Sequence, residues 1–399
     1  MSYDLPPRRE LPPEARERIR LRFRAALDQP ARNRRPIWLV AAAVVLLAAG
    51  AVFATGVLRD DKSGLPPASR PGDLASSTLD RCWAAAQAEG RTGPLADRGQ
   101  WVATAAESRG DDVVVAFTVG GKPVFCETTA TTVTLSDPAA QPARPGGQDA
   151  GVLLYTATGV VAGVTDPSWE LVEVSMPDGL GLVMVTPDRQ TGQFIAFTGT
   201  DPAKTELWLG RAKPRQSGRL WPRGAVPRIP APLMSVTDRS GDRSTPEGRA
   251  LGECLSRVPN PPDGAAGYQP GAMLTDGANR LVLGQAPGHL IACVQEGTSY
   301  RLVKDTFIGQ SIPVRRLSVP AVGGKVPFVG LVVPSAAEMT VEFTHGGGNS
   351  YSPTAVPIVN GTFAYWLAPD EVGDGNGNVY IQVDDAKKAS LFNGPIPLK

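Results

Sequence analysis

Residues 113–127 read VVVAFTVGGKPVFCE, and residues 280–295 read RLVLGQAPGHLIACVQ. In each stretch, two runs rich in β-branched and other apolar residues flank a short connection that contains glycine, which predicts a β-hairpin. Each stretch places one cysteine in its second predicted strand, Cys126 in the first and Cys293 in the second. The two stretches therefore predict that one structural design occurs twice in the chain.

A longer repeat surrounds the two hairpins. Cysteine, turn and aromatic positions recur in one order, with an offset of 167 to 172 residues between the copies. This order predicts a duplicated region with copies at 76–213 and 244–399, joined by a basic, proline-rich linker at 214–243. The matching anchors are Leu79–Cys82 with Leu251–Cys254, Val133–Asp137 with Arg301–Asp305, Ala162–Val164 with Val329–Leu331, Val172–Val174 with Val341–Phe343, and Gly192–Phe197 with Gly361–Trp366.

Each copy is expected to begin with a helix that covers its hairpin. In the first copy Ser77 is a candidate N-cap, and Cys82 and Trp83 follow at helical spacing. In the second copy Thr245 is the candidate N-cap, and Pro246 takes the first helical position, where its missing N–H does no harm.

The later part of each copy is predicted to be a small β-sandwich, because short alternating strands are separated there by Asp, Gly and Pro. The predicted fold class is therefore a single transmembrane helix followed by an extracytoplasmic, duplicated α+β or all-β region. In each copy a helix-on-sheet subdomain would precede a small β-sandwich. The predicted sandwich strands are Glu170–Ser175, Leu182–Thr186 and Gln193–Phe197 in the first copy, and Thr340–Thr344, Thr362–Leu367 and Val379–Val383 in the second.

The four cysteines, Cys82, Cys126, Cys254 and Cys293, are an even number and fit disulfides in an oxidising compartment. Four cysteines allow three pairings, among which sequence alone does not choose. The repeat favours Cys82 with Cys126 and Cys254 with Cys293. Each bond would close a loop of about 40 residues, for which chain entropy gives roughly 4 kcal/mol of stabilisation. Free buried thiols are the alternative.

Residues 37–58 form an apolar run without a charged side chain. As a helix this run would be about 33 Å long, enough for a hydrocarbon core of about 30 Å. Three arginines within residues 32–35 precede it, and positive charge stays on the cytoplasmic side. We therefore expect a single-pass protein of the cell membrane, with the lipid bilayer as a partner, residues 1–36 in the cytoplasm and, after a linker at 59–75, an extracytoplasmic C-terminal region. A cleaved signal peptide is the alternative.

The predicted cytoplasmic tail carries a helical pattern of apolar residues and arginines. Three interpretations are open: a helix lying on the anionic inner leaflet, a docking helix for a cytoplasmic protein, or a disordered tail whose arginines only set the topology. The candidate contact residues are Ile19, Phe23 and Leu27 on the apolar stripe, with Arg16, Arg20 and Arg24 around it.

Two further patterns favour ordinary structure over a site. The basic linker contains Trp221 and would suit anionic envelope polymers or lipid head groups, but a solvated linker is favoured. Asp374, Asn376 and Asn378 alternate with glycines, and Asp385 follows eleven residues after Asp374, a spacing similar to that of a calcium loop. Because Val379 takes the position where such a loop needs glycine, a plain turn is favoured.

Composition and motifs argue against several classes of function. The formal net charge of +1 gives no long-range field that would attract nucleic acid. The only two histidines, His289 and His345, share no metal-like spacing, and His289 is expected to be a strand residue beside its hairpin. No nucleophile elbow, Walker loop, dinucleotide fingerprint or His-Glu-x-x-His motif occurs. We therefore expect a non-enzymatic protein without a cofactor or metal.

The layout of residues 11–58, a short arginine-rich helix before one span, resembles that of membrane-anchored anti-sigma regulators of high-GC Gram-positive bacteria. The outer copies resemble uncharacterised single-pass envelope proteins of the same bacteria. The resemblance implies a sensory outer region and a cytoplasmic partner for the tail. The tail departs from these regulators because it has no His or Cys for the zinc cluster that they often carry.

The leading interpretation is a binding protein whose duplicated outer region takes up an extracytoplasmic ligand or an envelope protein, as a sensor or anti-sigma-like regulator. The alternative is a structural or assembly component of the cell envelope. If the two copies share a groove, Trp83, Trp101 and Tyr268 are the candidate aromatic residues in it, but core packing is favoured for each.

Overall fold

The computed structural model describes residues 71–177, 182–200, 205–212, 223–306, 313–344, 353–367 and 378–397. All of these belong to the compact unit Pro66–Lys399. The tail at 1–36 and the apolar run at 37–58 lie outside the described residues. Within those residues, no helix combines the length and apolar character needed to cross a membrane.

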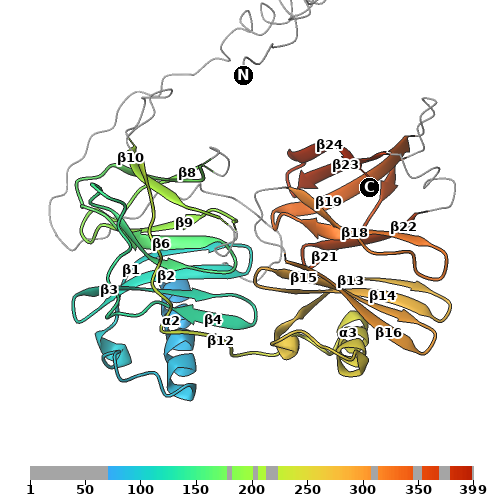
Figure 1. The fold of residues 1–399 in the computed structure, drawn as a ribbon, viewed down its shortest axis with the longest axis horizontal. Coiled ribbons are helices and arrows are strands. Elements are labelled where there is room, and N and C mark those ends of the chain that lie inside the picture. Colours follow the sequence, from blue (N-terminus) through green and yellow to red (C-terminus); the bar gives the residue numbers. More distant parts are fainter. Residues whose placement is uncertain are drawn as a thin grey trace, which may run out of the picture. The chain divides into compact units, whose positions relative to one another are not determined.

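The first half of the described chain, residues 71–239, is a stack of four layers (Figure 1). The helix α2 (Pro71–Ala88) lies on a five-stranded sheet, a three-stranded sheet lies in the middle, and a four-stranded sheet forms the last layer. In order across each sheet, the strands are β1 (Val102–Arg109), β2 (Asp112–Val119), β3 (Lys122–Thr128), β4 (Thr132–Leu135) and β12 (Met234–Thr237); β5 (Gly151–Tyr155), β6 (Val160–Val164) and β9 (Gln193–Phe197); and β11 (Arg223–Ala225), β10 (Trp208–Ala212), β7 (Leu171–Ser175) and β8 (Val183–Val185).

The second half, residues 240–397, repeats these layers with α3 (Pro246–Arg257) on the first sheet (Figure 1). Its three sheets are antiparallel and four-stranded. In order, their strands are β13 (Gln269–Asp276), β14 (Asn279–Ala286), β15 (His289–Glu296) and β16 (Ser299–Thr306); β17 (Val314–Leu317), β18 (Val326–Val332), β22 (Thr362–Leu367) and β21 (Ile358–Val359); and β20 (Thr354–Ala355), β19 (Ala336–Thr344), β23 (Asn378–Asp385) and β24 (Ser390–Pro397).

The middle sheet of each half is buried on both faces. In β6, Val160 and Ala162 pack toward the five-stranded sheet, whereas Val161 packs toward the four-stranded sheet. Successive side chains of a strand point to opposite faces, so a strand covered on both sides needs a near-continuous apolar run. The sequences VVAGV of β6 and VPFVGLV of β18 are such runs.

The repeat predicted from the sequence is present as a repeated sheet architecture. The strands β1, β2 and β3 begin 167 residues before β13, β14 and β15. The predicted start of the second helix is confirmed as well. Thr245 Oγ1 accepts a 3.0 Å hydrogen bond from the Gly248 N–H, and Pro246 stands at the first helical position.

Both predicted disulfide pairings are confirmed. Cys82 of α2 is bonded to Cys126 of β3, and Cys254 of α3 is bonded to Cys293 of β15. The Cα atoms lie 6.5 Å apart in the first bond and 6.2 Å apart in the second. Each bond ties a helix to the sheet beneath it, and the described residues include no free cysteine.

The predicted fold class, a transmembrane helix followed by a duplicated α+β or all-β region, is wrong for this structure. The described part consists mostly of antiparallel β-sheet, and its only α-helices are α2 and α3, neither of which could span a membrane. The physical reason is that each half stacks three sheets, so most of its residues are needed to bury sheet faces against one another.

Two local boundaries also differ from expectation. The helix α2 begins at Pro71 rather than after Ser77, whose hydroxyl donates to the Leu74 carbonyl inside the helix. The region predicted as a linker at 214–243 contains β11 and β12, which pair with β10 and β4 of the first half. Such short strands have little periodicity of their own, and they form because each finds an open sheet edge.

Candidate functional site

A cleft with a volume of about 610 Å³ is lined by residues of both halves. The first half contributes its β1–β2 turn, its β3–β4 turn and Thr158. The second half contributes Asp242, the β14–β15 hairpin turn and segments around β18 and β21. The polar side chains in the lining are Arg109, Asp111, Asp112, Thr129, Thr131, Thr158, Asp242, Gln269, Gln285, His289 and Asn360.

Asp112 and Glu127, hereafter the acid pair, belong to the first half, and Thr158, which hydrogen-bonds to Glu127, lines the cleft. Asp112 is the first residue of β2 and lines the cleft. Glu127 lies opposite Val114 in the β2–β3 ladder, and its side chain is only 2 % exposed. The Thr156 hydroxyl donates a 3.0 Å hydrogen bond to Glu127 Oε1, and the Thr158 hydroxyl donates to the same oxygen. A carboxyl group is therefore enclosed at the end of an otherwise apolar sheet face.

Burial makes both members of the acid pair hard to ionise. Burial raises the pKa of Glu127 to about 8, with a further rise from Asp112 and an opposing effect of the two threonine hydrogen bonds. Burial also raises the pKa of Asp112 to about 7, where Asp111 adds to the rise and Arg109 opposes it. Both carboxyls of the acid pair therefore gain or lose a proton near neutral pH.

Two contacts join the halves beside the cleft. In the first, the glycine contact, Gly110 of the β1–β2 turn has a φ of +61° and lies so close that a Cβ added to it would be 2.9 Å from Pro334 Cβ. In the second, the threonine contact, Thr131 Oγ1 of the β3–β4 turn donates a 2.8 Å hydrogen bond to the Gly267 carbonyl. The β1–β2 turn leads directly into β2, which carries Asp112, and the β3–β4 turn directly follows β3, which carries Glu127.

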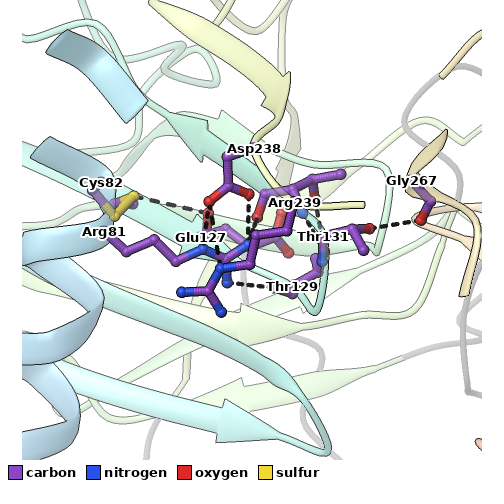
Figure 2. Close-up of polar contacts among 10 residues, drawn as sticks. Arg81, Cys82, Glu127, Thr129, Thr131, Asp238, Arg239 and Gly267 are labelled. Carbon is purple, nitrogen blue, oxygen red and sulfur yellow. Dashed lines mark hydrogen bonds and ion pairs between the residues drawn. A yellow bond between two sulfur atoms is a disulfide. The ribbon is translucent and has the colours of Figure 1, made fainter. Parts of the chain in front are cut away.

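A part-buried ion pair holds the β3–β4 turn from the other side of its sheet. Arg81 of α2 forms a two-pronged pair with Asp238, at 2.7 Å from Nε to Oδ2 and 2.6 Å from Nη2 to Oδ1 (Figure 2). The same guanidinium donates to the carbonyls of Thr129 and Thr132, and the Asp238 N–H donates to the Thr131 carbonyl. We call this arrangement the arginine clasp. It fixes the turn that makes the threonine contact.

The aromatic residues singled out from the sequence pack in the core and do not line the cleft. Trp101 is 6 % exposed, stacks on Phe117 at a centroid distance of 4.6 Å and meets Trp83 edge to face at 5.5 Å. Tyr268 is 4 % exposed within the apolar cluster under α3. Core packing is therefore confirmed for these three residues.

Other sequence candidates are placed as follows. His289 begins β15, is exposed and lines the cleft. Asn378 begins β23, and the Asp385 carboxylate accepts hydrogen bonds within a tight turn. No group of three His, Cys, Asp or Glu side chains suited to a metal occurs among the described residues. The candidates that lie outside the described residues are Ile19, Phe23, Leu27, Arg16, Arg20, Arg24, Trp221, His345, Asp374 and Asn376.

Sequence reasoning missed the acid pair. One feature of the sequence points to it, because the strand KPVFCET carries a charged residue directly after its cysteine, where the strand HLIACVQE carries Val294. A carboxyl in a strand buried on both faces costs free energy unless it is hydrogen-bonded or protonated. The pattern therefore marks Glu127, although only the folded chain supplies Asp112 and the threonine hydroxyls.

Two comparisons of the sequence with known proteins identify no relative. No protein-family model matches the chain, and no curated protein has a significantly similar sequence.

Proposed function

We propose that this chain is a non-enzymatic binding protein of an oxidising, extracytoplasmic compartment, and that its cleft takes up a polar ligand with a cationic group. The cleft volume of about 610 Å³ carries the proposal, because ligand sites typically measure about 300–1,000 Å³ and favour the boundary between two lobes. The two disulfides support the compartment, since such bonds persist where the environment is oxidising.

The charges of the lining support a cationic ligand. Asp111 and Asp242 line the cleft, together with Asp112, whose raised pKa leaves it partly ionised near neutral pH, against one arginine, Arg109. Asp242 remains ionised because hydrogen bonds from Ser244 lower its pKa. Hydroxyl and amide side chains complete the lining, so a ligand with several hydrogen-bonding groups is favoured over an apolar one.

A binding experiment with three small probes tests this function. Isothermal titration of the full-length chain with spermidine, maltotriose and citrate compares a cation, a neutral polyol and an anion. We expect spermidine to bind most tightly. Asp242→Asn should weaken its binding about fivefold, which corresponds to about 1 kcal/mol, because the amide removes the charge and keeps an oxygen acceptor for the Ser244 N–H.

Asp263→Asn is the matched control, because Asp263 is exposed on the second half and does not line the cleft. It should leave spermidine binding unchanged. If spermidine binds no more tightly than citrate, or if both variants weaken it equally, the cleft does not recognise a cation and the proposal is wrong.

We propose in addition that the tail at 1–36 reports binding to a cytoplasmic protein, as a sensor would. The sequence pattern supports this step through Ile19, Phe23 and Leu27. Replacing these three residues by serine in the full-length chain should abolish retention of a cytoplasmic partner. If the wild-type chain retains no such partner, the regulatory role is wrong and a binding role without signalling remains.

A further inference from the structure

Each member of the acid pair lies at the base of a turn that touches the second half. Asp112 directly follows the β1–β2 turn, which makes the glycine contact. Glu127 lies two residues before Thr129, where the β3–β4 turn begins, and that turn makes the threonine contact. Displacement of either carboxyl therefore moves backbone that joins the halves.

The β3–β4 turn is connected on several sides, so it cannot shift without changing other contacts. The N–H groups of Asp238 and Arg239 both donate to the Thr131 carbonyl, while the Thr131 hydroxyl donates to Gly267. The Thr129 and Thr132 hydroxyls are 2.8 Å apart and hydrogen-bonded. A change at Glu127 is thereby transmitted to the strand that leads into the second half and to the second half itself.

Few positive charges face the acid pair. Arg109 is near Asp112, but Asp111 lies beside it with the opposite sign. Around Glu127, the nearby donors are neutral hydroxyl groups. If both carboxyls ionise, three negative charges gather against one guanidinium. The charged and titratable groups around the acid pair are Arg109 at the end of β1, Asp111 on the β1–β2 turn, Asp242 and His289 across the cleft, and Arg81 of α2 on the other face of the sheet.

We infer that the acid pair is a proton-sensing latch on the contacts between the halves: it holds them when protonated and loosens them when both carboxyls ionise. This further function does not depend on the ligand of the cleft. Loosening would relieve the repulsion because it admits water to Asp112 and Glu127.

The direction of the pH effect follows from proton linkage. With the contacts made, the pKa values of Asp112 and Glu127 are about 7 and about 8. With the contacts open and the groups hydrated, their pKa values return toward the ordinary values of about 4. The closed form therefore binds more protons between these limits. Rising pH favours the open form, by up to about tenfold per pH unit for each group.

Hydrogen exchange of the full-length chain at pH 6 and pH 8 tests the latch. The informative amides are those of Thr129 and Asp238, which donate within the β3–β4 turn and to it. After correction for the intrinsic pH dependence of exchange, we expect their protection to fall at least about tenfold from pH 6 to pH 8. Amides of the β14–β15 ladder, whose buried residues are apolar, serve as the internal control and should keep their protection.

Two variants separate the latch from a general effect of pH. Glu127→Gln keeps the side-chain volume and removes one of the two titrations, so the difference in protection between pH 6 and pH 8 should become at least about threefold smaller than in the wild-type chain. If this variant does not form both disulfides, Asp112→Asn replaces it, because the second half has asparagine at the equivalent Asn279.

Three results would overturn the inference. The first is protection at Thr129 and Asp238 that does not change with pH in the wild-type chain. The second is an equal loss of protection in the β14–β15 ladder, which would indicate general destabilisation. The third is a variant without the titrating carboxyl that retains the full pH effect. None of these results depends on spermidine binding, so failure of the latch and failure of the proposed function are distinguishable.

Discussion

The two halves share a fold but differ where the first half faces the cleft. At the repeat offset of 167 residues, Glu127 corresponds to Val294 and Asp112 corresponds to Asn279. Val294 is fully buried in the apolar cluster between two sheets, whereas Glu127 is enclosed with hydroxyl groups. The same strand register therefore supports either an apolar core or a titrating site. The fold supplies the position, and one side chain decides its chemistry.

A second difference concerns the edge of the first sheet. In the first half this sheet has a fifth strand, β12, next to β4, whereas the matching sheet of the second half has four strands. The chain after β12 brings Asp238 to Arg81 and so forms the arginine clasp. The position equivalent to Arg81 is Glu253, whose side chain remains 38 % exposed while it contacts Arg257, Arg280 and the Tyr300 hydroxyl. The second half therefore has no clasp, and the comparison can be tested by substitution.

We expect the largest loss of stability from removing a disulfide, because each half has one between its helix and its first sheet. Replacing Cys82 and Cys126 by alanine should lower the free energy of unfolding by about 2–5 kcal/mol, because the unfolded chain regains conformational freedom. Replacing Cys254 and Cys293 should cost a similar amount. Denaturant unfolding of the two double variants measures both values. A negligible cost in one half would show that the halves are not stabilised alike.

The arginine clasp should have the next largest effect. Arg81→Ala leaves Asp238, whose side chain is 16 % exposed, without its partner, and it removes donors from two carbonyls. We expect a loss of about 2–4 kcal/mol in denaturant unfolding. Glu253→Ala is the matched control, because its side chain is 38 % exposed, and it should cost less than about 1 kcal/mol. Equal losses would remove the distinction between the halves.

The acid pair should make stability depend on pH. Because the folded pKa of Glu127 is raised to about 8, the native state binds more protons than the unfolded state above pH of about 4. Stability is therefore complete at low pH and is lost as pH rises toward 8, by up to about 1.4 kcal/mol per pH unit for this group. Glu127→Val, which introduces the residue of the second half, should make this dependence less steep, while Asp112 retains its own contribution.

Unfolding curves between pH 5 and pH 8 measure this dependence. A variant as steep as the wild-type chain would show that other groups cause it. A wild-type chain that gains stability over this range would contradict the raised pKa itself.

The smallest effect isolates the glycine contact. Gly110 and its equivalent, Gly277, both have positive φ, at +61° and +58°, but only Gly110 lies against Pro334. Gly277→Ala should cost about 1 kcal/mol for the left-handed backbone. Gly110→Ala should cost about 1 kcal/mol more, because its Cβ would meet Pro334 Cβ at 2.9 Å. Equal costs in thermal unfolding would mean that this contact contributes no stability.

Features with local causes could be predicted from the sequence. The hairpins follow from apolar runs around short glycine-containing turns, and the start of α3 follows from Thr245 and Pro246. The repeat favoured the disulfide pairing that the structure contains. The start of α2 was missed, and so were the short strands β11 and β12, of which β12 pairs with β4, about 100 residues earlier in the chain. The fold class, a transmembrane helix followed by a duplicated α+β or all-β region, was wrong, since antiparallel sheets dominate the described residues and neither of their α-helices could span a membrane.

The sequence by itself determined the repeat and the apolar runs and favoured one cysteine pairing, because side-chain period, turn residues and spacing act over short distances or recur at a fixed offset. Only the tertiary structure decided that three sheets stack in each half, that Asp112 and Glu127 share one buried site, and that both halves line a cleft. The reason is physical: burial and charge proximity arise from residues that are distant in sequence, and these determine the pKa values on which the proposed latch depends.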